Sequence, residues 1–239
     1  MPENFFAKAT DPQQYDSAEI DWKTEGLQAS LSRRFFQEYL RKYLDIKDKS
    51  VIDVGSGMGQ LFPLLKELGV KKIQGVEPSS NNVKVANELY PDVPVLTCSL
   101  SDIPEDTKYD AAIAVMVFEH IGDIDGAFKK INQLLSSKGR FYLIVANKGY
   151  FMMPRFDFSI ESQEQGEGVV AIKTVRPRTS GVLYDVLRPL DNYVAAAKKN
   201  GFALDKHVGL LPTETYIKAV PKVAQFDDIP VGDFLIFSK

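Results

Sequence analysis

The chain has 239 residues, of which 44% are hydrophobic and 26% are charged. This length fits one large domain, or one domain that carries a cap, and the composition is that of a globular protein with a sizeable core. The formal net charge is −3, so the chain as a whole lacks the basic character of a nucleic-acid-binding protein. We therefore expect no nucleic-acid partner.

Cysteine usage and hydropathy indicate the compartment. The single cysteine, Cys98, cannot form an internal disulfide, which is typical of proteins in a reducing environment. The first residues lack the apolar segment of a signal peptide. The longest apolar run, residues 111–118, is far shorter than the roughly 20 residues that span a bilayer. The sequence therefore predicts a cytoplasmic protein without a membrane span.

The N-terminal segment, residues 1–45, is predicted to be helical in its second half. Apolar side chains recur there at every fourth residue, at Leu31, Phe35, Tyr39 and Tyr43. This spacing is that of one face of a helix.

Residues 46–146 alternate between apolar runs of strand length and helix-like segments. The predicted strands are "SVIDVG", "IQGVEP", "VPVLTC", "YDAAIAVMVFEHI" and "RFYLIVAN". The predicted helices are "QLFPLLKELGV", "SNNVKVANELYP" and "IDGAFKKINQLLSSKG", the last of which is expected to end at its Lys-Gly pair. Strands that alternate with helices predict a parallel sheet that is covered by helices on both faces.

Residues 147–183 break this alternation. The stretches "RFDFSIES" and "VVAIKTVR", joined by "QEQGEG", predict a β-hairpin. The insertion is rich in phenylalanine and methionine, and long excursions of this kind are often lids, so we expect it to cap a binding site.

The alternation resumes in residues 184–239. The predicted elements are a helix, "PLDNYVAAAKKNGF", and two strands, "ALDKHVGLL" and "GDFLIFSK". No crossover helix is evident between these strands, so the last strand is expected to be antiparallel. The predicted fold is a single α/β domain over residues 1–239, with a Rossmann-like, mostly parallel seven-stranded sheet and a small cap.

Three glycines follow the first predicted strand of the sheet, at Gly55, Gly57 and Gly59. Such a turn allows a ligand to approach the backbone, and a tight turn without a ligand is the alternative. Glu77 ends the next predicted strand, where a carboxylate accepts hydrogen bonds from a ribose diol. The third glycine comes one residue earlier than in the G-x-G-x-x-G dinucleotide motif, which argues against a dinucleotide.

Five motifs in this part of the chain resemble those of one enzyme family. They are "VIDVGSGMG", "GVEPS", "TCSLSDIP", "YDAAIAVMVFEHI" and "LLSSKGRFYLI". In order and approximate spacing they are similar to the motifs of class I S-adenosylmethionine-dependent methyltransferases, in the small-molecule branch that includes quinone-biosynthesis enzymes. The resemblance covers about residues 48–146. It implies S-adenosylmethionine as cofactor and transfer of its methyl group to a small organic acceptor by in-line displacement.

The resemblance also implies roles for individual residues. Asp53 and the backbone of Gly55 and Gly57 would hold the amino-acid end of the cofactor, and Glu77 would bind the ribose. Relatives often have an aspartate at the position aligned with Ser99, so Asp102 is an alternative for the adenine contact. The full expected cofactor set is Asp53, Gly55, Ser56, Gly57, Gly59, Gln60, Glu77, Pro78, Ser99, Leu100 and Met116.

Several other residues are candidates for contact with the methyl acceptor. His120 follows the fourth strand, where it is either a catalytic base or substrate contact, or a structural residue of the next turn. Tyr15, Trp22, Glu119 and Arg188 are candidate substrate contacts. No metal site is predicted.

Two other functions stay open at this point. One is a non-catalytic protein that binds S-adenosylmethionine, because in-line displacement requires no obligatory catalytic side chain. The other is a nucleotide-dependent oxidoreductase on the same fold. The sequence leaves open whether oxygen, nitrogen or carbon is methylated, and it leaves the oligomeric state open.

Overall fold

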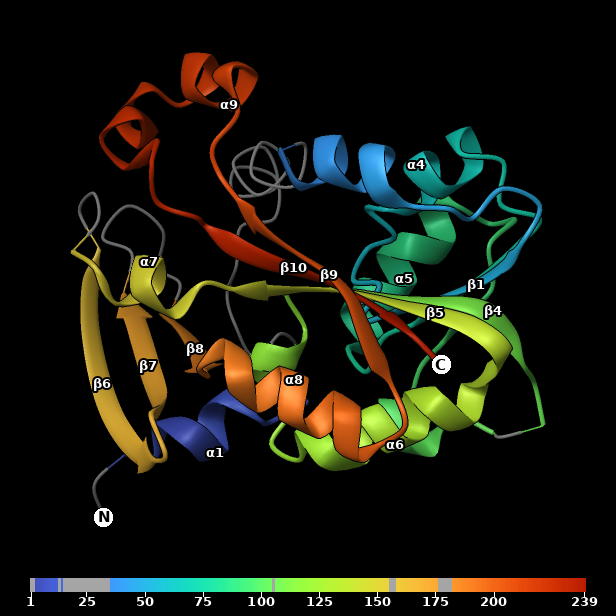
Figure 1. Cartoon of the computed structure of the whole chain (residues 1–239), viewed down its shortest axis with the longest axis horizontal. Coiled ribbons are helices and arrows are strands. Elements are labelled where there is room, and N and C mark those ends of the chain that lie inside the picture. Colours follow the sequence, from blue (N-terminus) through green and yellow to red (C-terminus); the bar gives the residue numbers. More distant parts are fainter. Residues whose placement is uncertain (1–2, 13, 15–34, 105, 155–157, 176–181) are drawn as a thin grey trace.

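The structure is a computed structural model, which describes residues 3–12, 14, 35–104, 106–154, 158–175 and 182–239. Seven strands form the main sheet (Figure 1). They are β1 (Ser50–Val54), β2 (Lys72–Val76), β3 (Val95–Leu96), β4 (Tyr109–Val115), β5 (Leu135–Ala146), β9 (Ala203–Leu210) and β10 (Gly232–Ser238). Their order is β3-β2-β1-β4-β5-β10-β9.

Strand direction agrees with the prediction. Strands β1 to β5 pair in parallel. The last strand, β10, lies between β5 and β9 and is antiparallel to both. The predicted mostly parallel sheet with an antiparallel last strand is confirmed.

Helices cover both faces of this sheet (Figure 1). The helix at residues 35–43 and α4 (Phe62–Glu67) lie on one face, and α6 (Ile124–Leu134) and α8 (Leu190–Lys199) lie on the other. The other helices and short 3₁₀ turns among the described residues are α1 (Phe5–Ala9), α5 (Ser80–Leu89), η1 (Leu100–Asp102), η2 (Phe118–His120), α7 (Lys148–Met152), α9 (Glu214–Ala219) and η3 (Pro221–Phe226). In the described part of the chain, no helix has the length and apolarity needed to cross a membrane.

The two layers of the core follow from the alternation of side chains along the central strands. In β1, Val51 packs against the layer of helix 35–43 and α4, whereas Ile52 packs against the layer of α6 and α8. Strand β4 divides its side chains in the same way and is fully buried from Ala111 to Ala114. Burial on both faces explains why these strands are continuous apolar runs in the sequence.

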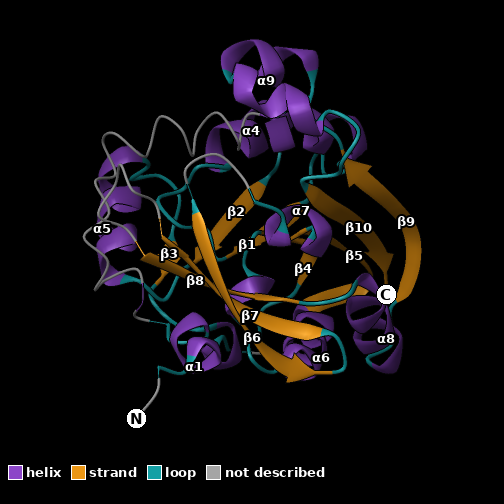
Figure 2. Ribbon diagram, turned by 90° about the vertical axis from the view of Figure 1, so that its left-hand side faces the viewer, coloured by secondary structure: helices purple, strands orange, loops and turns teal. Residues whose placement is uncertain are grey.

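A second, three-stranded antiparallel sheet forms the cap, with the order β6-β7-β8. Its strands are β6 (Ser159–Gly166), β7 (Val169–Val175) and β8 (Val182–Leu187). Figures 1 and 2 show this sheet to one side of the main sheet, with α1 packed against it. The predicted hairpin is confirmed, although β6 continues to Gly166 and leaves a two-residue turn. Both turn residues, Glu167 and Gly168, have positive φ, as a type I′ hairpin requires.

The third cap strand was not predicted. Strand β8 runs through the predicted boundary at residue 183, so that boundary falls inside an element of the cap. Its sequence, "VLYDVL", is short and does not alternate cleanly. Pairing with β7 is what makes it a strand. The division of the chain into segments otherwise stays a prediction.

Two predicted boundaries are wrong. The fourth strand ends at Val115 rather than continuing to Ile121, because Met116 adopts a φ of 57° and η2 follows. Such a φ is uncommon for a residue other than glycine and ends the extended conformation. The helix predicted to end at the Lys-Gly pair stops at Leu134, so that pair lies inside β5.

Candidate functional site

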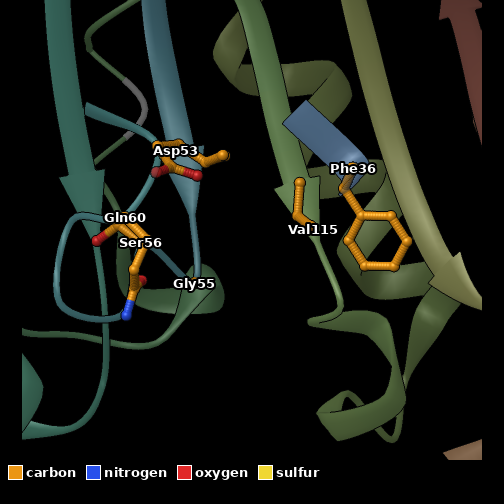
Figure 3. A pocket seen from close by; sticks show the side chains of 7 residues that line it. Phe36, Asp53, Gly55, Ser56, Gln60 and Val115 are labelled. Carbon is orange, nitrogen blue, oxygen red and sulfur yellow. The ribbon is translucent and has the colours of Figure 1, made fainter. Parts of the chain in front are cut away.

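The turn after β1 lies at the carboxyl edge of the sheet, where open α/β folds bind ligands. A small pocket opens there, and Figure 3 shows Asp53 and Ser56 on one side of it with Phe36 and Val115 on the other. The full lining is Phe36, Asp53, Gly55, Ser56, Gln60, Leu61 and Val115. The polar members and Gly55 were predicted from the sequence. The apolar members come from three different elements, and no sequence motif marks them.

Gly55, the first glycine after β1, is required by the backbone conformation of the turn and by its packing. Gly55 has a φ of +66°, and a Cβ there would lie 2.4 Å from Cγ2 of Val117. Its N–H donates to the carbonyl of Val76 at 2.8 Å. The turn and its packing therefore account for Gly55 without a ligand, and the predicted contact of its backbone with a cofactor stays a prediction.

Glu77 is bonded directly to the glycine turn. Its side chain is buried, with 5% exposed, and Oε2 accepts the N–H of Gly57 at 2.9 Å. Oε1 accepts the N–H of Ser79 at 3.0 Å and a side-chain N–H of Asn82 at 3.3 Å. A carboxylate has about four lone-pair sites, so a ribose hydroxyl would bond at a further site or replace one of these three partners. The structure thus brings Glu77 and Gly57 together, and their roles toward a cofactor stay predictions.

Two buried polar side chains point to a ligand in the pocket. Asp53 is 1% exposed and Ser56 is 4% exposed. In the described part of the chain, Oγ of Ser56 has no hydrogen-bond partner. A buried hydroxyl without a partner costs free energy unless something else bonds to it. The pocket therefore offers a carboxylate and an unsatisfied hydroxyl within one small volume, a combination that suits the ammonium and carboxylate groups of an amino acid.

The residues expected at the adenine lie on the following segments. Pro78 is half-buried and comes directly after Glu77. Ser99 and Leu100 are half-buried at the start of η1. Asp102 is exposed, and its carboxylate accepts a hydrogen bond from the hydroxyl of Ser101 at 3.2 Å. Burial thus favours Ser99 over Asp102, and the adenine contacts stay predictions.

The loop after β4 begins with Met116, which is half-buried and packs against both the core and the cap. Glu119, in η2, is 1% exposed; Oε1 accepts the backbone N–H of Ala146, and Oε2 has no partner among the described residues. Burial is the main cause that raises the pKa of the Glu119 carboxyl to about 7, and the nearby Asp185 carboxylate contributes in the same direction. Glu119 is therefore partly protonated at neutral pH.

His120 lies where three segments meet. Its Nδ1 is 3.0 Å from Nε2 of Gln14, and its Nε2 is 3.7 Å from Oδ1 of Asp185 on β8. Burial lowers the pKa of the imidazole, and the Asp185 carboxylate opposes that change. Asp185 was not predicted as a site residue, because only the pairing of β8 with the cap brings it to His120.

Arg188 follows β8 and is 5% exposed. Its guanidinium donates to the carbonyl of Phe118 at 2.8 Å and to the carbonyl of Ile121. These bonds hold the loop after β4 against the end of the cap. A contact between Arg188 and an anionic substrate group stays a prediction.

Two of the predicted substrate contacts, Tyr15 and Trp22, lie outside the described residues. Within those described, no group of three or more His, Cys, Asp or Glu side chains is arranged to bind a metal ion.

Comparison of the chain with known proteins identifies its family. The chain is 29% identical over 170 residues to the mitochondrial ubiquinone biosynthesis O-methyltransferase of Bos taurus. This match covers 67% of this chain and 43% of the bovine protein. It is 26% identical over 178 residues to the ubiquinone biosynthesis O-methyltransferase of Bradyrhizobium diazoefficiens. That match covers 63% of this chain and 70% of the bacterial protein. The chain thus spans less than half the length of the bovine relative.

Solved structures support the same fold. The S-adenosylmethionine-dependent methyltransferase from Mesorhizobium loti superposes with a TM-score of 0.69 at 19% identity, over 87% of this chain and 100% of that one. The PH0226 protein from Pyrococcus horikoshii superposes with a TM-score of 0.69 at 15% identity, over 99% of both chains. The family model for a methyltransferase domain matches residues 27–206. This match extends over well more than half of the sequence, and the chain belongs to the methyltransferase domain family.

Proposed function

We propose that the chain transfers a methyl group from S-adenosylmethionine to a small organic acceptor. The observation that carries this proposal is the pocket beside the glycine turn, where Asp53 is buried and the Ser56 hydroxyl has no hydrogen-bond partner among the described residues. Family membership supports the reaction. Similar structures of an S-adenosylmethionine-dependent methyltransferase and of an N-methyltransferase bound to S-adenosylmethionine support the cofactor.

The residues of the pocket fit the cofactor. Asp53 would bind the ammonium of its amino-acid end, the Ser56 hydroxyl would donate to its carboxylate, and Glu77 would accept from its ribose. When bound, the cofactor supplies a methyl group that is already activated by a sulfonium. The chain's own task is then to hold the acceptor in line with that methyl group and to exclude water, which the apolar side chains of Phe36, Leu61 and Val115 favour.

A small acceptor is favoured over a macromolecule by two observations. The relatives from Bos taurus and Bradyrhizobium diazoefficiens are named for ubiquinone biosynthesis, which supports a quinone precursor or a similar small molecule. The net charge of −3 disfavours a nucleic-acid acceptor. We place the reaction in the cytoplasm, in keeping with the single cysteine.

Calorimetry with three ligands tests the cofactor. We expect S-adenosylmethionine and S-adenosylhomocysteine to bind and NAD not to bind. Binding of NAD alone would favour the oxidoreductase. A labelled-methyl assay over pools of small acceptors tests the reaction. Tight cofactor binding without transfer to any pool would favour a non-catalytic binding protein.

The variant Glu77→Ala tests the ribose contact. It should lower cofactor affinity by about 1.5–3 kcal/mol, because it removes a charged hydrogen-bond acceptor. Unfolding in urea provides the control, since Glu77 also holds Gly57. A variant that is folded and binds the cofactor as the wild type does would remove Glu77 from the site.

A further inference from the structure

Phe36 forms part of the wall of the proposed cofactor pocket. It lies in the helix at residues 35–43, and its side chain is 5% exposed. Figure 3 shows its ring on the side of Val115, across the pocket from Asp53 and Ser56. Of the described residues that line the pocket, Phe36 alone is aromatic and Asp53 alone has an acidic or basic side chain. The pocket therefore places an aromatic ring opposite a carboxylate.

The alternation of side chains along β1 and β4 explains this placement. Val51 and Ile113 belong to the core layer on the α4 side of the sheet. Asp53 and Val115 come two residues further along these strands, so their side chains are on the same face. Phe36 packs into this layer as well. Its ring thus covers the carboxyl edge of β1 and β4 from the helix side.

The ring of Phe36 is held by its neighbours. One edge lies against β10, where a Cβ built on Gly232 would be 3.5 Å from Cε1 of Phe36. The ring centroid of Phe35 is 5.2 Å from that of Phe36, and Phe35 itself stacks on Tyr216 of α9 at 5.2 Å. A ring that is fixed by packing loses little side-chain entropy when a ligand binds, so it is already arranged for contact.

The charge on the sulfur distinguishes the proposed cofactor from its product. S-adenosylmethionine carries a sulfonium, whereas S-adenosylhomocysteine carries a neutral thioether. Both compounds have the same ammonium, so a carboxylate that binds the ammonium makes the same contact with each. The face of an aromatic ring attracts a cation within about 6 Å of its centroid and has no such attraction for a neutral sulfur. Phe36 is the pocket residue that can supply this selection.

We propose that Phe36 is a specificity residue, whose ring binds the sulfonium by a cation–π interaction and favours the charged cofactor over its neutral product. This inference rests on the proposed cofactor and on its amino-acid end lying at Asp53. Only two methylene groups separate the sulfonium from the carbon that carries the ammonium. A ligand that is anchored at Asp53 therefore keeps its sulfur within the small pocket that Phe36 lines.

The same contact assists exchange of the product. In the transfer step, the acceptor forms a bond to the methyl carbon, and the electron pair of the broken carbon–sulfur bond stays on the sulfur. The sulfur is then neutral, and the attraction of the Phe36 ring for it is lost. The ring thus weakens binding of the product relative to that of the next cofactor molecule.

The ratio of two dissociation constants measures this selection. Calorimetry gives the Kd of S-adenosylhomocysteine and of S-adenosylmethionine for the wild type and for Phe36→Leu, which keeps an apolar side chain without the ring. The ratio of the first Kd to the second should fall about 2- to 30-fold in Phe36→Leu, the range of cation–π interactions from exposed to desolvated sites. An unchanged ratio would overturn the proposal.

Val115→Ala is the matched control, because it alters the apolar wall on the side of Phe36 and leaves the ring in place. It may change both affinities through lost packing, but their ratio should stay within about twofold of the wild type. A ratio that falls as far in Val115→Ala as in Phe36→Leu would assign the effect to packing and overturn the role of the ring.

Fluorinated phenylalanines at position 36 test the electrostatics without a change of shape. Incorporation of the 4-fluoro, 3,5-difluoro and 3,4,5-trifluoro forms withdraws electron density from the ring face in steps. Affinity for S-adenosylmethionine should fall with each step, whereas affinity for S-adenosylhomocysteine should stay within about twofold. Urea unfolding checks that each protein is folded. A constant affinity for S-adenosylmethionine across the series would overturn the proposal, even if Phe36→Leu does not fold.

The outcomes separate this inference from the proposed function. A wild type that binds neither compound overturns both the cofactor and the role of Phe36. A wild type that binds both compounds, with the same ratio in Phe36→Leu and in the fluorinated series, overturns the role of Phe36 alone. A wild type that shows the effect of the ring but transfers no methyl group to any acceptor pool supports the role of Phe36 and counts against the proposed reaction.

Discussion

The turn after β1 and the loop after β4 lie at the same edge of the sheet, but different kinds of contact hold them. The β1 turn is bonded to its neighbour in sequence order, through the Gly57 N–H and the Glu77 carboxylate 20 residues later. The β4 loop is held by Arg188, which is 70 residues from Phe118, and by Gln14, which is 106 residues from His120. One side of the candidate site is therefore local, and the other depends on the cap and the N-terminal segment.

This difference predicts different responses to change. The local side should keep its ligand contacts when the cap is perturbed, since Gly55 bonds to Val76 and Gly57 bonds to Glu77 within the main sheet layer. The β4 loop should respond to protonation and to substitutions in distant segments. Three substitutions compare the two sides, from the largest expected effect to the smallest.

The largest effect is expected at Glu119, on the β4 side. Its pKa is about 7 in the folded protein against an ordinary value of 4.5, so at intermediate pH the folded state holds a proton that the unfolded state has lost. Stability from this group is thus present at low pH and is lost as the pH rises toward 7. The total loss between pH 4 and pH 8 is about 3 kcal/mol.

Glu119→Gln isolates this contribution, because the amide does not titrate in this range. Urea unfolding of both proteins from pH 4 to pH 8 should show the free-energy difference moving by about 3 kcal/mol in favour of the variant as the pH rises. Glu161→Gln, at an exposed position of the cap, is the control variant. A parallel pH dependence in wild type and Glu119→Gln would contradict the buried, partly protonated state.

The second effect is expected at Asp53, on the β1 side. Asp53→Asn removes the charge that would bind the ammonium of the cofactor, so its affinity should fall by about 1.5–3 kcal/mol, or roughly 10- to 150-fold. Asp110→Asn is the matched control: it lies at the other end of the sheet, where its carboxylate accepts the N–H of Ser50 at 2.8 Å. Calorimetry with S-adenosylhomocysteine measures both. Equal affinities in the two variants would remove Asp53 from the site.

The same local-versus-distant contrast explains what the sequence predicted. Strand β1, the glycine turn and strand β2, which precedes Glu77, were predicted because each is marked by a continuous apolar run or by glycines within a few residues. The resemblance to methyltransferases depends on these same local motifs. The pocket residues Asp53, Gly55, Ser56 and Gln60 were found for that reason.

Most of the features that the sequence did not predict depend on contacts between distant segments. The apolar run through β4 carries no sign of the positive φ at Met116 that ends the strand. Strand β8 is too short and irregular to be recognised alone, and without it Asp185 has no visible partner. Phe36 and Leu61 line the pocket only because helix 35–43 and the start of α4 pack over the sheet. Periodicity places such residues on a helix face, but not on a particular pocket.

The smallest effect is expected at Ser56, and its sign is informative. The Oγ of Ser56 is buried without a partner in the described part of the chain, so Ser56→Ala should leave the ligand-free protein as stable as the wild type or slightly more stable. If the hydroxyl bonds to the cofactor, the same change should lower cofactor affinity by about 0.5–1.5 kcal/mol, or roughly 2- to 10-fold. Urea unfolding without ligand and calorimetry with S-adenosylhomocysteine give the two values.

A serine with a purely structural role would give a different result in each of the two measurements. Ser56→Ala would then lower the stability of the free protein and leave cofactor affinity unchanged, because the hydroxyl would be bonded within the chain. Opposite signs for stability and affinity are the behaviour expected of a group that the fold buries unsatisfied in order to bind a ligand. Ser56→Ala therefore separates a binding turn from a merely tight one, a question that the three glycines alone leave open.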